Sequence, residues 1–217
     1  MQKRGRARKN GPKGSPRDPG AVPRRGRPPL VDRERLLDAA ERAIRRHGPK
    51  VSLERIAAKA GVTKPALFSH VGDRRALVQA LAERLLARIE SQIRAAVAGA
   101  AGGRDSLERL IRAELETIAA DRHLYAFVNG AGAGDTTLET TLAFARRSAE
   151  PLIAGITQDR KSRGLDSAPA EAWGHAIIGA LHMAGLWWIQ KPAAERDARR
   201  LAAQLTDLLW DGLAPRS

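Results

Sequence analysis

The sequence of 217 residues contains no cysteine. Disulfide bonds, cysteine-ligated zinc, iron–sulfur clusters and thiol catalysis are therefore excluded. Long apolar runs are also missing, because the longest, at 176–189, has 14 residues where about 20 are needed to cross a bilayer. The N-terminus lacks the apolar segment of a secretory signal. We expect a cytoplasmic protein that makes no membrane contact.

Acidic residues are scarce relative to basic ones, with 24 Asp and Glu against 38 Lys and Arg, a net charge of +14. Residues 1–29 alone hold ten Lys or Arg and one Asp, and so carry +9 of this charge. So basic a chain favours a polyanionic partner, and we predict double-stranded DNA. Because residues 1–30 combine this charge with many Gly and Pro and almost no large apolar side chains, we expect them to be a disordered basic tail.

From residue 31 onward, apolar residues recur at three- and four-residue spacing and strand signals are few. This pattern predicts an all-α fold of about nine helices. Caps and breakers place the helices at about 33–47, after Ser52, at 64–70, and at 74–98, 105–120, 122–130, 137–163, 168–190 and 195–212.

The most specific feature is a pair of short helices joined by Ala60-Gly61-Val62. A glycine suits the left-handed turn, Ala57 is small enough for the helix crossing, and Leu67 supplies an apolar residue under the second helix. This spacing predicts a helix-turn-helix, whose second helix enters a major groove. An ordinary corner of two helices with a solvated polar face is the alternative, and the basic charge favours DNA.

Residue chemistry divides the expected DNA contacts into two kinds. Ser52, Arg55 and Lys64 suit the anchoring of phosphates, which sets the register without reading sequence. Base edges are left to the exposed side of the second helix, which begins at Thr63 and offers apolar or hydrogen-bonding side chains. These are Pro65, Ala66, Phe68, Ser69 and His70.

Residues 51–77, VSLERIAAKAGVTKPALFSHVGDRRAL, resemble the DNA-binding signature of TetR-type transcriptional regulators. Phe68 stands where that family usually has a tyrosine, Pro65 where it usually has a small residue, and Val71 where a phenylalanine is common. The resemblance implies phosphate contacts for His70 and Arg74. It also implies a DNA-binding domain at 31–76, followed by a helical ligand-binding and dimerisation domain at 77–217.

The basic tail contains the short run Arg25-Gly26-Arg27-Pro28, which resembles an AT-hook. Glycine lets such a backbone lie flat in a narrow minor groove, whose negative potential attracts the flanking arginines. A tail that only solubilises the protein and attracts the duplex through bulk charge is an equally good interpretation.

Three of the four tryptophans fall within 168–190, where apolar residues recur on one helical face. Such a stripe is compatible with plain core, but aromatics are also enriched at interfaces. The family resemblance implies a homodimer through the last two helices and, by symmetry, a palindromic operator. We predict interface positions at Trp173, Ile177, Ala184, Trp188, Leu201, Leu205 and Leu208.

The larger domain is expected to bind an unknown small-molecule effector. Bulky or polar residues on helices of otherwise small residues are the candidates for its pocket, although each also suits a core. They are Ile89, Phe127, Phe144, His175, His182 and Met183. Glu171, His175 and His182 share a helical face and would suit a metal, but histidines that line a pocket or core are far commoner.

We find no nucleophile with a suitably spaced base, and we expect neither catalysis nor a cofactor. The glycines of 130–134 follow a helical segment instead of a strand, which favours a loop over a dinucleotide site. The favoured interpretation is a sequence-specific repressor that a ligand releases from DNA. Two alternatives remain, an architectural, largely non-specific DNA-binding protein and an all-helical enzyme or carrier with a vestigial DNA reader.

Overall fold

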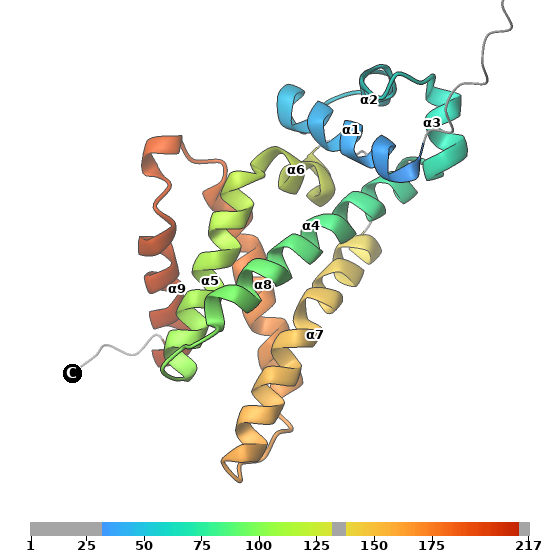
Figure 1. The fold of residues 1–217 in the computed structure, drawn as a ribbon. Helices are drawn as coiled ribbons and strands as arrows, with labels where there is room; N and C mark the ends of the chain where they lie inside the picture. Colours follow the sequence, from blue (N-terminus) through green and yellow to red (C-terminus); the bar gives the residue numbers. More distant parts are fainter. Residues whose placement is uncertain (1–31, 132–137, 213–217) are drawn as a thin grey trace, which may run out of the picture. The chain divides into compact units, whose positions relative to one another are not determined.

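The computed structural model describes residues 32–131 and 138–212, with the backbone alone for Phe144 and some of its neighbours. Within these ranges every regular element is a helix and none is a strand (Figure 1). The α-helices are α1 (Arg33–His47), α2 (Leu53–Lys59), α3 (Lys64–Val71), α4 (Arg74–Val97), α5 (Gly103–Ala120), α6 (Arg122–Ala126), α7 (Leu138–Ser162), α8 (Ala170–Trp188) and α9 (Ala198–Asp211). The expected all-α fold is therefore confirmed.

Local capping explains where the first helices begin. The side chains of Asp32, Ser52 and Thr63 accept hydrogen bonds from backbone N–H groups in the first turns of α1, α2 and α3. Between α2 and α3, Gly61 has φ +71°, in the left-handed region that favours glycine. The helix-turn-helix expected from the spacing is therefore present.

The three N-terminal helices share a small apolar core. Leu36, Leu37 and Ile44 of α1 pack with Ile56 of α2 and Leu67 of α3, and all five side chains are at most 1% exposed. The core uses nearly every large apolar side chain of these short helices. Because it holds α3 in place from one side only, the other side of α3 is left to solvent.

Helix α4 begins at Arg74, directly after its cap Asp73, and runs from the three N-terminal helices to the helices that follow it (Figure 1). Its first half packs against α1, α3 and α6, and it also packs along α5. Leu77, Leu81 and Leu85 are fully buried along this path, and Ile89 is nearly so. Helices α7 and α8 pack as a pair, while α9 packs on α5.

Two expected helices differ from the observed ones. The α-helix predicted at 122–130 ends at residue 126 and is followed by a kinked π-type turn, Phe127–Ala131, whose backbone is not helical at Asn129 and at Gly130, where φ is +98°. The helix predicted at 195–212 starts at Ala198, because Asp197 caps it by accepting a hydrogen bond from the Arg200 N–H; a short 3₁₀ turn, Ala193–Glu195, precedes it.

The α7–α8 contact depends on Gly174, which is buried against Ile153. A Cβ at this position would collide with Cγ1 of Ile153 and lie 3.3 Å from its Cδ1. We expect Gly174→Ala to lower the free energy of unfolding by about 1–3 kcal/mol, as overpacking does. Urea denaturation measures this change.

Gly155→Ala in α7 is the matched control, because no atom lies within 4 Å of its added Cβ. A helix-interior glycine replaced by alanine should stabilise by about 0.5–1 kcal/mol. If the two variants unfold at the same urea concentration, the close approach of Ile153 to Gly174 does not require a glycine in the α7–α8 contact.

Candidate nucleic-acid interface

The outer side of α3 carries the side chains predicted to face DNA. Thr63, Pro65, Ser69 and His70 are exposed, while Ala66 and Phe68 are partly exposed. Leu67 and Val71 are buried on the opposite side of the helix. The structure therefore brings the predicted residues of α3 together on one accessible surface, with Ser52 and Arg55 exposed at the start of α2.

Lys64 is engaged by a neighbouring helix. Its Nζ lies 2.7 Å from Oε1 of Glu54 in α2, and 6.0 Å from the centre of the Phe68 ring. The hydrogen bond from Lys64 lowers the pKa of Glu54 to about 2, which keeps this carboxylate charged. A negative charge thus sits beside a lysine expected to contact phosphate, a feature that the sequence analysis missed.

Polar groups at the end of α3 hold each other in place. The Ser69 hydroxyl donates to the Ala66 carbonyl at 2.9 Å and lies 3.0 Å from Nδ1 of His70, which itself lies 2.8 Å from that carbonyl. If Nδ1 carries the proton toward the carbonyl, the other ring nitrogen is left to accept a hydrogen bond. The exposed ring is thereby oriented by its own helix.

The remaining predicted DNA contacts are placed differently. Arg74 is partly exposed, and its guanidinium carbon lies 6.0 Å from the centre of the Phe127 ring, against the turn after α6. Arg25, Gly26 and Arg27 lie outside the described residues. The structure thus groups the residues of α2 and α3, while Arg74 lies at the start of α4, beside Phe127.

Buried carboxylates tie α1 to α4 and α6. The Glu41 carboxylate, 6% exposed, lies 2.7 Å from Arg45 and 3.1 Å from Arg88. Asp121, which precedes α6, lies 2.6 Å from Arg45 and 3.3 Å from Arg88. These four residues, which we call the α1–α4 junction, connect the three N-terminal helices to the rest of the chain.

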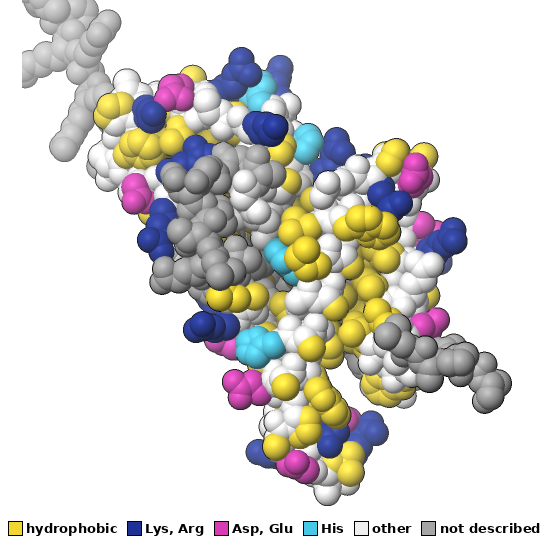
Figure 2. All heavy atoms as spheres, turned by 180° about the vertical axis from the view of Figure 1, so that it is seen from behind, with side chains coloured by type: hydrophobic (Ala, Val, Ile, Leu, Met, Phe, Trp, Pro, Cys, Tyr) yellow, Lys and Arg dark blue, Asp and Glu magenta, His cyan; other side chains and the backbone are white. Residues whose placement is uncertain are grey.

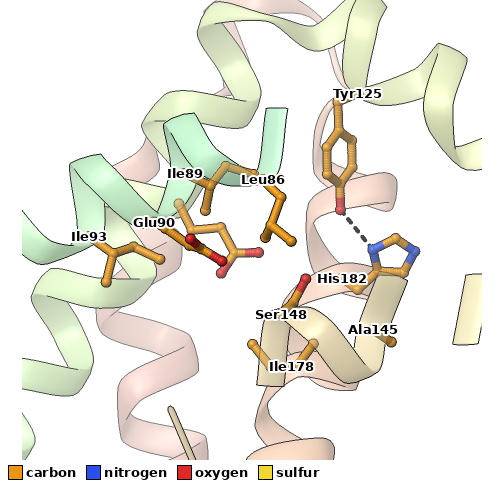
Figure 3. A pocket seen from close by; sticks show the side chains of 10 residues that line it. Leu86, Ile89, Glu90, Ile93, Tyr125, Ala145, Ser148, Ile178 and His182 are labelled. Carbon is orange, nitrogen blue, oxygen red and sulfur yellow. Dashed lines mark hydrogen bonds between the residues drawn. The ribbon is translucent and has the colours of Figure 1, made fainter. Parts of the chain in front are cut away.

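A pocket opens on the other side of α4, with about 480 Å³ of space, part of it open to solvent. Five helices line it, with Leu86, Ile89, Glu90 and Ile93 from α4, Glu114 from α5, Tyr125 from α6, Ala145 and Ser148 from α7, and Ile178 and His182 from α8 (Figure 3). The space in it that the centre of a water-sized sphere can reach is only about 40 Å³, well below the usual volume of a small-molecule site, so a ligand would have to displace side chains of its wall.

Burial controls the ionisation of the polar groups in this pocket. The Tyr125 hydroxyl lies 2.9 Å from Nδ1 of His182, as the dashed line in Figure 3 shows. Burial raises the pKa of Tyr125 and lowers that of His182, which favours the neutral form of both groups, and the imidazole tautomer sets which of them donates. Burial also raises the pKa of Glu114 to about 7.

Of the six residues predicted for a pocket, Ile89 and His182 line this one. Phe127 is fully buried in the core, whereas His175 and Met183 are exposed, and nothing is described for the Phe144 side chain. The sequence analysis missed Glu114. This residue occupies a core position in the apolar spacing Leu107, Ile111, Ile118 of α5, a signal that would have identified it.

The seven residues predicted for a dimer interface divide by exposure. Trp173 is 47% and Leu208 is 40% exposed, and Ile177, Ala184 and Leu205 are partly exposed. Trp188 and Leu201 are buried within the chain, at 3% and 8% exposure. Trp187, which the sequence analysis did not select, is 55% exposed.

In the described part of the chain, no three His, Asp or Glu side chains are grouped so that they would hold a metal ion. None of the helices found there combines the length and hydropathy required to cross a membrane.

Comparison with known families assigns the chain. Residues 36–81 match the family described as bacterial regulatory proteins, tetR family. Residues 92–217, more than half of the chain, match the tetracyclin repressor-like C-terminal domain. The chain belongs to the TetR family. Together with the helix-turn-helix, this membership makes it a DNA-binding transcriptional regulator.

Similar proteins of known sequence and structure agree with this TetR-family assignment. An uncharacterized HTH-type transcriptional regulator of Mycobacterium tuberculosis is 29% identical over 183 residues, which are 83% of this chain and 76% of that protein. FadR of Bacillus halodurans is similar in structure with a TM-score of 0.65 at 21% identity, covering 85% of this chain and 97% of that one.

Two further structures of transcriptional regulators contain a bound ligand. FadR of Bacillus subtilis, in complex with stearoyl-CoA, has a TM-score of 0.66 at 18% identity and covers 83% of this chain and 99% of its own. FadR of Thermus thermophilus, in complex with lauroyl-CoA, has a TM-score of 0.60 at 23% identity and covers 85% and 96%. At these identities the likeness shows the fold alone.

Proposed function

We propose that this TetR-family chain is a homodimeric repressor that a small molecule, bound in the pocket beside α4, releases from a palindromic operator. The main support for this proposal is that α4 contacts both the DNA-reading helices and the pocket. The helix packs against α1 and α3 near its start and lines the pocket with Leu86, Ile89, Glu90 and Ile93 farther along. A ligand that displaces this wall would therefore also displace the DNA-reading helices.

The proposed DNA contacts follow the exposed surface of α2 and α3. Ser52, Arg55 and Lys64 anchor phosphates, while Pro65, Ala66 and Ser69 face base edges, and His70 contacts either. The AT-hook-like run at 25–27 is proposed to enter an adjacent minor groove. Domain limits of 31–76 for the reader and 77–217 for the ligand-binding and dimerisation domain complete the proposal.

The proposed dimer forms through α8 and α9. Trp173, Met183 and Trp187 are each about half exposed or more, and their spacing puts them on one side of α8. Figure 2 shows hydrophobic side chains gathered on the face seen from behind. Exposed aromatics on a regular helix are typical of an interface that a second copy covers.

Release must obey linkage. A ligand shifts the equilibrium between DNA-binding and released states only by the difference of its affinities for the two. DNA must weaken ligand binding by the same factor by which the ligand weakens DNA binding. FadR proteins in complex with stearoyl-CoA and lauroyl-CoA show that a chain of this fold accommodates a ligand with a long acyl chain.

The test begins with selection of duplexes from a random pool by the full chain, followed by footprinting of the selected DNA. A protected inverted repeat whose half-sites lie about 34–36 Å apart supports the proposal. Equal affinity for all duplexes would instead favour an architectural role driven by the tail. Turnover of a bound compound would favour an enzyme or carrier.

The Glu54–Lys64 pair makes a testable prediction. Glu54→Gln releases Lys64 and removes a negative charge beside α3, so DNA affinity should rise about five- to tenfold at low salt. The slope of log K against log salt should steepen by roughly one unit per subunit. Fluorescence anisotropy with the selected duplex over a salt series measures both.

Glu108→Gln is the matched control, because it makes the same charge change at an ion pair on α5, 3.8 Å from Arg104. Its DNA affinity should stay within about twofold of the unaltered chain, since charges beyond a Debye length are screened. Equal effects of the two variants would show that net charge, and not the position beside α3, controls binding.

A further inference from the structure

The pocket beside α4 has an unusual balance of charge. Its apolar wall is formed by Leu86, Ile89, Ile93 and Ile178, and its two charged side chains are Glu90 and Glu114. None of the lysines or arginines that the structure describes lines it, and its histidine is hydrogen-bonded to Tyr125. Among the described residues, no ion pair or side-chain hydrogen bond reaches either carboxylate. In Figure 3, Glu90 and Ser148 lie around the space between α4 and α7.

From this lining we propose that the ligand is a small lipophilic amine, protonated in solution, whose ammonium group pairs with Glu114 and Glu90 while its apolar part packs against the isoleucines. The proposal rests on the proposed function, because it names the ligand class of the same effector site. An amine supplies the positive charge and the N–H donors that the two carboxylates lack.

An anionic head group does not fit this lining. A carboxylate or phosphate entering the pocket would lose its water and meet two carboxylates without a compensating cation. The Tyr125 hydroxyl is already directed to His182. The pocket therefore differs in charge from what a fatty acid or an acyl-CoA requires, although the fold resembles proteins solved with acyl-CoA.

The ionisation of Glu114 supports the same conclusion. Burial raises its pKa to about 7, so the empty pocket holds this group partly protonated at neutral pH. A bound ammonium stabilises the ionised form and lowers this pKa, and so binding releases protons near pH 7. Amine affinity should accordingly rise as pH increases from 6 to 8, about tenfold for a single group that titrates near 7.

Three probes of one length test the proposal on the full chain: octylammonium, octanol and octanoate, titrated by calorimetry at pH 8. We expect octylammonium to bind at least about tenfold more tightly than octanol, and octanoate more weakly than octanol. Glu114→Gln should reduce the preference for the amine to about threefold or less and remove the pH dependence. Glu90→Gln should reduce the preference to a smaller extent.

Glu116→Gln, two residues away on the exposed side of α5, is the control and should retain the full preference. Octanoate binding as tightly as the amine, a preference that survives Glu114→Gln, or no amine binding at millimolar concentration would each overturn the proposal. All three glutamine variants keep the shape of the side chain, and thermal melts are the check that each one folds.

Anisotropy with the selected duplex separates this proposal from the function on which it rests. If the amine binds with the expected preference but leaves DNA affinity unchanged, the ligand class stands and the role as effector fails. If octanoate or octanoyl-CoA binds and releases the DNA, the effector role stands and the amine is wrong.

Discussion

Trp187→Asp should convert the proposed dimer into a monomer and lower affinity for the proposed operator by about two to three orders of magnitude. The side chain is 55% exposed on α8, so its replacement leaves the core of the chain intact. In a two-fold interface every substitution occurs twice, and loss of a buried tryptophan commonly costs about 2–4 kcal/mol per copy. The monomer also loses the gain in affinity from two linked half-site contacts.

Light scattering at micromolar concentration measures the mass, and anisotropy with the selected duplex measures the affinity. Met183→Asp, at a side chain that is 65% exposed on the same side of α8, should also lower both the mass and the DNA affinity. Leu142→Asp on α7 is the control, because this leucine is also exposed, at 45%, but lies outside the proposed interface. A dimeric Trp187→Asp variant with full operator affinity would place the interface elsewhere.

The residues predicted for the interface also show where sequence periodicity fails to predict which side chains are buried. The stripe from Trp173 to Trp188 keeps steps of three and four residues, yet Trp173 is exposed and Trp188 is buried. At about 100° per residue, 15 residues leave Trp188 roughly 60° away from Trp173 around the helix. Over a long helix this angular offset carries residues of one stripe from the exposed side of the helix to its buried side. A stripe alone therefore does not distinguish core residues from interface residues.

Helix limits were accessible from sequence because they depend on neighbours in the chain. Asp32, Ser52 and Thr63 begin helices through hydrogen bonds two or three residues away, and Gly61 makes its turn through its own φ. The α6 prediction failed beyond residue 126, because the sequence does not show that the chain continues as a kinked π-type turn.

The pocket was harder to predict from the sequence, because its lining comes from five helices that are far apart in the chain. Ile89 and His182 were selected for bulk or polarity, and Phe127 met the same criterion but packs into the core. Whether such a side chain faces space or protein depends on the packing of α4 to α8. A glutamate within an apolar stripe, such as Glu114, is a better indicator, since an ionisable group rarely occupies a core position without a purpose.

Ion pairs of the α1–α4 junction make the second large prediction. The Glu41 carboxylate is 6% exposed and accepts hydrogen bonds from Arg45 at 2.7 Å, Arg88 at 3.1 Å and Arg84 at 3.4 Å. Glu41→Gln keeps the shape but leaves these guanidiniums with less negative charge around them. Removing one partner of a buried pair costs about 3–5 kcal/mol, and because the arginines are partly exposed we expect about 2–3 kcal/mol.

Urea denaturation measures this loss, and Glu34→Gln is the control, since Glu34 also pairs with Arg84 but is 59% exposed and should cost less than about 1 kcal/mol. Combining Glu41→Gln with Arg88→Gln tests the cause. If the buried pair is responsible, the double variant should be clearly more stable than the sum of the single losses, because the second change removes a charge that the first left unpaired. Additive losses would instead assign the effect of Glu41 to packing, and the junction would then not act as an electrostatic link between α1 and the pocket-lining helix α4.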